Sequence, residues 1–185
     1  MRQNDPFGGL IVIEPVKHGD HRGFFSETYN QQTLLSKFGI ECDFVQDNHS
    51  LSVASSVVRG LHFQVPPMEQ AKLVRVTKGA VLDVALDIRR ESPSFGHHFA
   101  VELSADNWKQ LFIPTGFAHG FCTLAPNTEF LYKITKPYSP EHERGVLWDD
   151  PALGIDWGAP EEPILSGKDK DLPILVDLPD HFLNL

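Results

Sequence analysis

Hydrophobic and polar residues alternate along most of the chain in short runs, a pattern typical of β-strands with one covered face. In the clearest run, 80–88, Leu82, Val84 and Leu86 share an apolar face, and Asp83 lies on the other, toward a polar interior. Turn residues separate it from similar runs at 9–15, 20–29, 44–50, 58–64, 71–76, 99–103, 110–114, 120–124 and 129–134. The pattern predicts a mainly β fold, an antiparallel jelly-roll barrel with a few short helices.

Local signals add a helix and a hairpin to these strands. Asn30 caps a predicted short helix over 30–38, and Gly39 occupies the position just past its end, where glycine is favoured. We expect this to be the only substantial helix. Lys78 and Gly79 form a turn that we expect to join the strands on either side of it as a hairpin.

The N-terminal part contains two apolar stretches with different expected surroundings. The stretch 9–15 is apolar on both faces, so we expect both to be covered, one of them by a second subunit. The stretch 20–29 begins with a turn and continues as an aromatic strand. Paired aromatic side chains are usually buried, so we expect Phe24 and Phe25 to lie in the core.

The stretch 58–64 is strand-like but carries two polar side chains suited to a binding site, Arg59 and His62. In a regular strand these two side chains point to opposite faces. Gly60 permits a bulge, an extra residue in the strand, which would bring both to the same side. The other interpretation is a histidine satisfied by hydrogen bonds in the core and an arginine in solvent.

Composition sets the broad class. The length of 185 residues suits one domain over 1–185, with the proline- and glycine-rich part after residue 138 wrapped on the barrel as short turns. No run of about 20 apolar residues could cross a membrane. The first six residues lack the apolar core of a signal peptide, and the two cysteines form no disulfide framework, so we expect a cytoplasmic protein. The net charge of -9 disfavours nucleic acid as a partner.

The spacing Pro-x-Gly-x-x-His at 114–119 resembles the second half-motif of the cupin superfamily of small β-barrels. Metal-binding cupins also present His-x-His and a following Glu in a first half-motif. Here His62 is followed by Phe63, Gln64 and Val65, so most of the first ligand set is missing. Two histidines are too few for the usual three or four ligands, and we predict no metal and no other cofactor. A metal-dependent cupin oxygenase or isomerase is the alternative.

Longer motifs indicate one family within this superfamily. In order, they are 20–27, 46–50, 59–64, 72–75, 114–121, 129–133, 138–144 and 166–169. Together they resemble the dTDP-4-dehydrorhamnose 3,5-epimerase family, and the similarity runs through nearly the whole chain. It implies a homodimer of cupin-type barrels that converts dTDP-4-dehydro-6-deoxy-D-glucose to dTDP-4-dehydro-L-rhamnose. That product leads to dTDP-L-rhamnose for surface polysaccharide such as lipopolysaccharide.

The resemblance implies four catalytic residues. An imidazole titrates near neutrality, so His62 takes a proton from the carbon beside the ketone, and Asp169 orients its ring. Lys72 stabilises the enolate, and Tyr132 returns a proton from the opposite face. Ordinary interpretations stay open for three of these residues. Lys72 also fits a solvent-facing strand lysine, and Tyr132 a core aromatic. Asp169 also ends a helix-capping pattern that starts at Ser166.

The same resemblance assigns further residues to the substrate. Cations face the diphosphate, aromatic rings stack on the base and other polar groups complete the contacts. The cations are Arg22, Arg59, His119 and Lys168, and the aromatic residues are Phe25 and Tyr138. The other polar residues are Glu27, Gln46, Asp47, Asn48 and Glu143. The segment 22–27 is expected to approach the neighbouring subunit's site through an exchanged N-terminal strand. One departure is 68–71, where a smaller, often glycine-containing run is expected, and it bears on local substrate fit.

Two alternatives to double epimerisation stay open. A related 3- or 5-monoepimerase of a dTDP-4-keto-6-deoxy sugar would use the same acid and base. A sugar-binding cupin without turnover would keep the cavity but would catalyse no proton exchange. The joint presence of His62, Lys72, Tyr132 and Asp169 disfavours this non-catalytic alternative.

Overall fold

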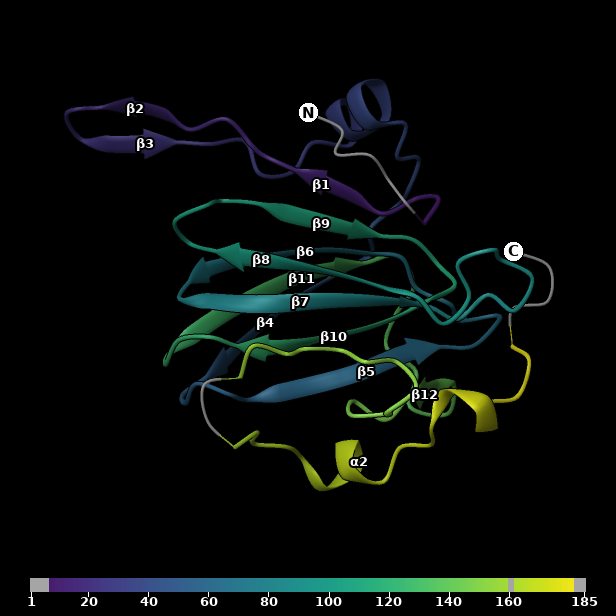
Figure 1. The fold of residues 1–185 in the computed structure, drawn as a ribbon. Helices are drawn as coiled ribbons and strands as arrows, with labels where there is room; N and C mark the ends of the chain where they lie inside the picture. Colours follow the sequence, from purple (N-terminus) through teal and green to yellow (C-terminus); the bar gives the residue numbers. More distant parts are fainter. Residues whose placement is uncertain (1–6, 160–161, 182–185) are drawn as a thin grey trace.

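Two five-stranded antiparallel sheets form the body of the protein in a computed structural model that describes residues 7–159 and 162–181 (Figure 1). The first sheet has the order β1 (Ile11–Ile13), β9 (Gln110–Ile113), β6 (Lys72–Lys78), β11 (Thr128–Ile134) and β4 (Gln46–Ser52). The second has the order β12 (Glu143–Gly145), β5 (Val58–Gln64), β10 (Phe117–Thr123), β7 (Ala80–Asp87) and β8 (His98–Ser104). This is the predicted jelly roll.

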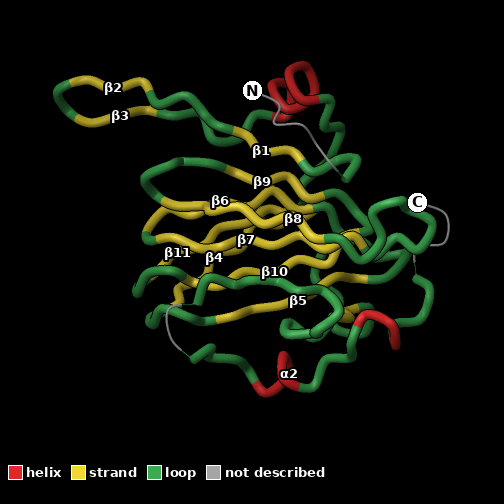
Figure 2. Tube along the Cα trace, in the orientation of Figure 1, coloured by secondary structure: helices red, strands yellow, loops and turns green. Residues whose placement is uncertain are grey.

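The remaining elements are small and lie around the two sheets (Figure 2). β2 (His18–Asp20) and β3 (Gly23–Phe25) pair with each other. The helical elements are α1 (Gln31–Thr33), the π-helical turn η1 (Leu34–Phe38), α2 (Gly167–Lys170) and the 3₁₀ turn η2 (Leu175–Asp177). In the described part of the chain, no helix is long and apolar enough to cross a membrane.

The core lies between the sheets and also behind the second one. Buried side chains of both sheets meet in the space between them, among them Val74, Val76, Val81, Ala85, Leu111 and Phe130. The outward face of the second sheet packs under the C-terminal part of the chain, through Leu61, Val84, Leu86, Val146, Trp157 and Leu175. The apolar face predicted for 80–88 therefore points to this outer layer, and Asp83 points inward as predicted.

The predicted hairpin of β6 and β7 is wrong, because the two strands belong to different sheets. The turn at Gly79 carries the chain from the first sheet to the second. Gly79 has a φ of 75°, and a Cβ there would lie 2.3 Å from Thr128 Oγ1, so only glycine fits. Both strands contribute apolar side chains to the same core. The alternation marked that shared face but could not distinguish neighbouring strands from opposing ones.

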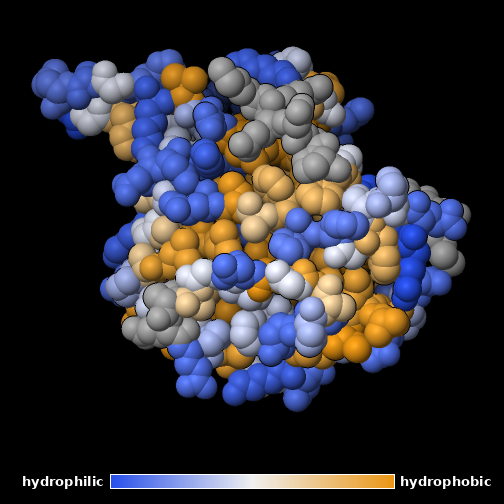
Figure 3. Space-filling model, in the orientation of Figure 1, coloured by the Kyte–Doolittle hydropathy of each residue, from blue (hydrophilic) through white to orange (hydrophobic). Residues whose placement is uncertain are grey.

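The prediction that Phe24 and Phe25 lie in the core is also wrong. Their exposed fractions are 53% and 71%, because β2 and β3 form an arm that extends from the body (Figure 1). Figure 3 shows the protruding arm with mostly hydrophilic residues at its tip. Phe24 contacts Trp108 edge to face, with ring centroids 5.1 Å apart. Phe25, by contrast, presents its apolar ring to solvent.

The helix predicted over 30–38 is present, with both of its caps. The Asn30 side chain accepts a hydrogen bond from the Thr33 N–H at 3.1 Å. Gly39 has a φ of 70°, and its N–H donates to carbonyl groups of the last turn. The first turn is α-helical, and the following turn from Leu34 to Phe38 widens into a π-helix.

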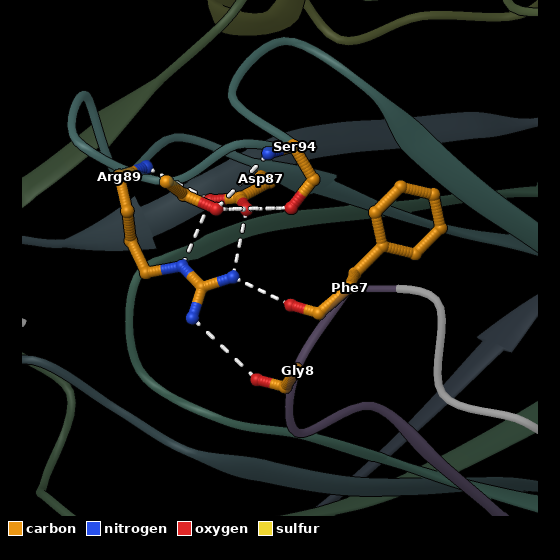
Figure 4. Close-up of polar contacts among 6 residues, drawn as sticks. Phe7, Gly8, Asp87, Arg89 and Ser94 are labelled. Atoms are coloured by element: carbon orange, nitrogen blue, oxygen red, sulfur yellow. Dashed lines mark hydrogen bonds and ion pairs between the residues drawn. The ribbon is translucent and has the colours of Figure 1, made fainter.

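Arg89 fastens the segment before β1 to the loop after β7 (Figure 4). Asp87 is fully buried and accepts hydrogen bonds from the Arg89 guanidinium at 2.7 and 2.9 Å and from Ser92 and Ser94. The guanidinium also donates to the carbonyl oxygens of Phe7, at 2.7 Å, and Gly8. Burial alone would raise the pKa of Asp87, but these hydrogen bonds lower it below its ordinary value.

Arg89→Met should lower the free energy of unfolding at pH 7 by about 3 kcal/mol, because it leaves a buried carboxylate without its charged partner. The folded-state pKa of Asp87 is lowered, so the pair stabilises the fold above the unfolded pKa of about 3.9 and loses this effect as pH falls. Urea unfolding measures the difference in the free energy of unfolding between the wild type and Arg89→Met. This difference should be large at pH 7 and small at low pH. Lys109→Met, in the long and partly exposed pair with Glu14, is the control and should change little. An equally small effect of both variants at pH 7 would contradict the prediction.

Candidate active site

A cavity of about 460 Å³ opens between the two sheets. Strands β4, β6 and β11 of the first sheet form one wall, and β5, β10 and β12 of the second form the other. All of the predicted catalytic residues and most of the predicted substrate-binding residues line it: His62, Lys72, Tyr132, Asp169, Gln46, Asn48, Arg59, His119, Tyr138, Glu143 and Lys168. Residues far apart in the sequence thus meet around one space.

A bulge in β5 places Arg59 and His62 on the same side, as predicted. In the pairing with β10, His62 faces His119 and Arg59 faces Phe121, so three steps along β5 match two along β10. Gly60 lies in this extra step with a φ of 126°, and a Cβ there would be 2.5 Å from the Gly120 Cα. The strand can therefore bulge only because residue 60 has no side chain.

The His62 imidazole is hydrogen-bonded to a buried carboxylate. Its Nε2 lies 2.6 Å from Asp169 Oδ1. Burial by itself would raise the pKa of Asp169, but the hydrogen bond and charge of His62, with Ser166, lower it. An ionised Asp169 accepts the proton on Nε2, which leaves the Nδ1 lone pair of His62 as the proton acceptor.

Asp169 combines the two roles that its sequence context suggested. Ser166 caps α2 by accepting a hydrogen bond from the Asp169 N–H at 3.2 Å. The Ser166 hydroxyl also donates to Asp169 Oδ2 at 2.8 Å, while Oδ1 bonds His62. The cap therefore holds the carboxylate that orients the histidine, and the capping interpretation and the catalytic one are compatible.

Lys72 is a buried lysine at the start of β6, with a 9% exposed fraction. Its Nζ donates to the His62 carbonyl oxygen at 3.3 Å, so the ammonium lies beside the strand that carries the imidazole. Burial lowers the pKa of Lys72 to about 8, against the opposing charges of Asp83 and Glu143. The interpretation of Lys72 as a solvent-facing lysine is wrong.

His119 forms a second buried pair, with Asp83. Its Nε2 lies 3.0 and 3.1 Å from the two carboxylate oxygens. Burial lowers the pKa of His119, although Asp83 opposes this effect. A largely neutral His119 contributes a polar wall rather than a free cation, so attraction for an anionic ligand comes chiefly from Arg59, Lys72 and Lys168.

Tyr132 lies on the opposite wall from His62, since β11 belongs to the first sheet and β5 to the second. Burial raises the pKa of Tyr132, so its phenol keeps its proton at neutral pH. A phenol that stays protonated can donate a proton to a carbon at its own side of the cavity.

Three polar side chains meet at the rim near β12. Glu143 Oε2 accepts hydrogen bonds from the Tyr138 hydroxyl at 2.6 Å and from the Lys168 ammonium. Burial alone would raise the pKa of Glu143, but Lys168 and Tyr138 lower it. The Tyr138 ring is 54% exposed, so it stands at the mouth of the cavity rather than in the core.

Four predicted substrate-binding residues lie outside this cavity. Arg22 pairs with Asp20 at the tip of the arm, and Phe25 is exposed. Glu27 accepts hydrogen bonds from Asn30 and Thr33, near the base of the arm. The fourth is Asp47 of β4, whose side chain points to the face opposite its neighbours. Its carboxylate pairs with the Lys133 ammonium at 2.9 Å.

Several cavity residues were missed from sequence: Ser50, Gln64, Gln70, Phe121, Phe130 and Ser166. Period-two alternation from His62 does point to Gln64, because the two share a face of β5. Gln70 lies in the run 68–71 that departs from the family pattern. Its Nε2 donates to the carbonyl oxygens of Lys136 and Pro137, so this run holds the chain near Tyr138.

The family model described as dTDP-4-dehydrorhamnose 3,5-epimerase matches residues 5–177. The chain belongs to this family. A Salmonella typhimurium protein with the name dTDP-4-dehydrorhamnose 3,5-epimerase is 54% identical over 166 residues, which are 90% of each chain. The chain is therefore an isomerase, and the interpretation as a sugar-binding protein without turnover is set aside.

Solved structures of epimerases have the same fold. A dTDP-4-dehydrorhamnose 3,5-epimerase from Bacillus anthracis, with TDP and PPi bound, has a TM-score of 0.90 and 46% identity over 94% of this chain and 98% of its own. RmlC from Legionella pneumophila, in complex with dTDP-4-keto-L-rhamnose, has a TM-score of 0.88 and 45% identity over 92% and 89%. The 3'-monoepimerase ChmJ from Streptomyces bikiniensis has a TM-score of 0.87 and 33% identity over 92% and 86%.

In this epimerase, kcat/KM should fall as the pH rises above about 8, because the Lys72 ammonium, with a pKa of about 8, loses its charge. A pH profile of kcat/KM reports the free enzyme and measures this directly. Lys72→Arg should be slower but should not show the fall, since a guanidinium stays charged. A fall at the same pH in Lys72→Arg would assign it to another group.

Proposed function

We propose that the protein inverts C3 and C5 of dTDP-4-dehydro-6-deoxy-D-glucose and releases dTDP-4-dehydro-L-rhamnose, by acid–base catalysis without a metal. The reaction supplies dTDP-L-rhamnose for surface polysaccharide, and we place it in the cytoplasm. The observation that carries the proposal is the position of the acid and the base. The His62–Asp169 pair and the Tyr132 phenol lie on opposite walls of one cavity, as inversion at a carbon requires.

The first step is removal of a proton from a carbon beside the ketone. His62 Nδ1 takes this proton, and Asp169 stabilises the imidazolium through the 2.6 Å hydrogen bond on Nε2. The carboxylate is itself held by Ser166, so the ring has one orientation. The electron pair left on carbon moves into the ketone, whose oxygen becomes an enolate oxygen.

Lys72 stabilises that enolate oxygen. Lys72 is buried, and a buried ammonium attracts developing negative charge more strongly than one in solvent. Burial has already lowered its pKa, and an adjacent oxyanion favours the charged form. C3 and C5 both flank the C4 ketone, so one ammonium serves both epimerisations.

Tyr132 completes each inversion by returning a proton from the other wall. Its phenol is neutral because burial raises its pKa, and a nearby Arg59 guanidinium favours the phenolate that remains after transfer. The imidazolium of His62 and the phenolate of Tyr132 then regain their resting states by proton exchange with water. No redox step is involved, and no atom other than hydrogen leaves or enters the sugar.

The rest of the cavity suits the nucleotide. Arg59 and Lys168 provide positive charge for the diphosphate, although the whole protein carries a net charge of -9. Tyr138 presents an aromatic ring at the mouth, where it can stack on the base. Gln46 and Asn48, on the same face of β4, complete the polar wall.

We also propose that the active protein is a homodimer in which each arm reaches the partner's site. The arm extends from the body (Figure 1), and Phe25 at its edge is 71% exposed. Arg22 and Glu27 lie outside the cavity of their own chain, although family resemblance assigns both to substrate. An apolar ring and polar groups on a projecting arm fit a contact with a second subunit.

A 3- or 5-monoepimerase is the second candidate, and similarity to ChmJ supports it. Incubation with the dTDP-4-keto sugar in deuterated water, followed by NMR, separates the two. We expect deuterium at C3 and at C5, with inversion at both carbons. Label at a single carbon would replace the double epimerase by a monoepimerase. Repeating the incubation after treatment with a chelator tests the prediction that no metal is needed.

Tyr132→Phe should separate proton exchange from inversion, because it keeps the ring but removes the far-face proton. His62, Lys72 and Asp169 still allow a proton to leave, so exchange should fall less than tenfold, while inversion falls about 100-fold or more. Deuterium incorporation and stereochemistry are measured in one sample. If Tyr132 only filled the core, the variant would lose roughly 1 kcal/mol of stability, and both rates would change equally.

The dimer proposal predicts complementation between two inactive variants. His62→Ala keeps an intact arm, and Arg22→Ala/Glu27→Ala keeps an intact cavity. In mixed dimers the intact arm of the first variant should complete the intact cavity of the second, giving about a quarter of wild-type activity in an equal mixture. Coexpression with two affinity tags isolates the mixed dimer, and each variant alone is the control. If each arm served its own chain, the mixture would stay inactive.

A further inference from the structure

The loop that carries Tyr138 is held mainly by side-chain amides. The Tyr138 ring is half exposed, and its hydroxyl bonds Glu143. The main-chain groups next to the ring are bound by Gln46, Gln64 and Gln70, which come from three separate segments. These amides therefore determine where the ring stands over the cavity.

Gln64 holds the main chain on both sides of Tyr138. Its Oε1 accepts a hydrogen bond from the Ser139 N–H at 2.7 Å, and its Nε2 donates to the Pro137 carbonyl oxygen at 3.2 Å. Nε2 also donates to the Met68 carbonyl oxygen at 2.6 Å. A main-chain N–H can only donate and a carbonyl can only accept, so these partners fix the amide in one orientation.

The other two amides support the same loop less directly. Gln46 Oε1 accepts from the Tyr138 N–H at 3.2 Å. Gln70 Nε2 donates to the carbonyl oxygens of Lys136 at 2.8 Å and Pro137 at 3.3 Å. Gln64 differs from both because it is 3% exposed and holds the main chain on both sides of Tyr138.

We propose that Gln64 is a positioning residue, which fixes the Tyr138 ring for contact with the base of the nucleotide. This rests on the proposed function, in which Tyr138 stacks on that base. Gln64 shares a face of β5 with His62, two residues away, so the strand that presents the catalytic base also sets the ring that holds the nucleotide. β5 thereby sets the distance between the catalytic base and the ring that contacts the nucleotide.

The proposal requires an amide at position 64 rather than any polar group of this size. A glutamate would still accept from the Ser139 N–H, but it would place a carboxylate against the carbonyl oxygens of Met68 and Pro137. A methionine has similar length and makes none of these hydrogen bonds. Both changes release the loop while His62 and Lys72 keep their own partners.

The test is a double-mutant cycle with Gln64→Met and Tyr138→Ala, in which calorimetry measures the Kd for dTDP. Loss of the loop contacts should raise the Kd about tenfold in the wild-type background. In the Tyr138→Ala background the same change should have little further effect, because the ring it positions is gone. At saturating substrate, kcat for deuterium exchange should change less than about twofold. Gln32→Met, at an exposed position, is the matched control and should bind dTDP like wild type.

An equal loss of dTDP affinity in both backgrounds would overturn the proposal, and so would a lower kcat with an unchanged Kd. If Gln64→Met does not fold, Gln70→Ala removes only the outer amide and should give a smaller loss of affinity that also vanishes in Tyr138→Ala. An unchanged Kd in Tyr138→Ala alone would remove the stacking role and this inference, while epimerase activity would stand. Absence of deuterium exchange in the wild-type protein would instead remove the proposed function itself.

Discussion

The geometry of the site depends on how closely β5 and β10 approach each other at Gly60. The two backbones leave no room for a side chain, since a Cβ on Gly60 would lie 2.5 Å from the Gly120 Cα. The extra residue accommodated there rotates the strand, so that Arg59 and His62 face the same cavity. A regular strand would send one of them to the opposite face, and the candidate base and the candidate diphosphate ligand would be separated.

Burial then gives the charged groups around His62 their properties. Lys72 and the Asp83–His119 pair are all taken out of water. Burial lowers the pKa of both basic groups, and the carboxylate of Asp83 opposes that change. The ammonium of Lys72 therefore has a pKa of about 8, and an oxyanion beside it would favour the charged form.

Much of the fold was predictable because alternation reports which side chains are covered. The inward position of Asp83, the caps of the helix near Asn30 and the bulge at Gly60 all follow from local patterns. Alternation does not report which sheet a strand joins, so it predicts a hairpin at Gly79, where the chain in fact crosses from one sheet to the other. The site itself joins distant segments, as in the His62–Asp169 pair, whose residues are 107 apart, and only family resemblance suggested that contact.

The number of carbons inverted is not decided by the acid and the base. In the proposed mechanism C3 and C5 share one ketone, and the same imidazole, ammonium and phenol serve both. What differs between the two carbons is how the sugar must lie to present each of them to His62. Phe121 and Phe130 line the cavity and stack with ring centroids 4.2 Å apart, and the His119 ring lies 6.1 Å from that of Phe130. One fold is therefore compatible with either outcome, since ChmJ shares it at 33% identity and carries the name of a 3'-monoepimerase.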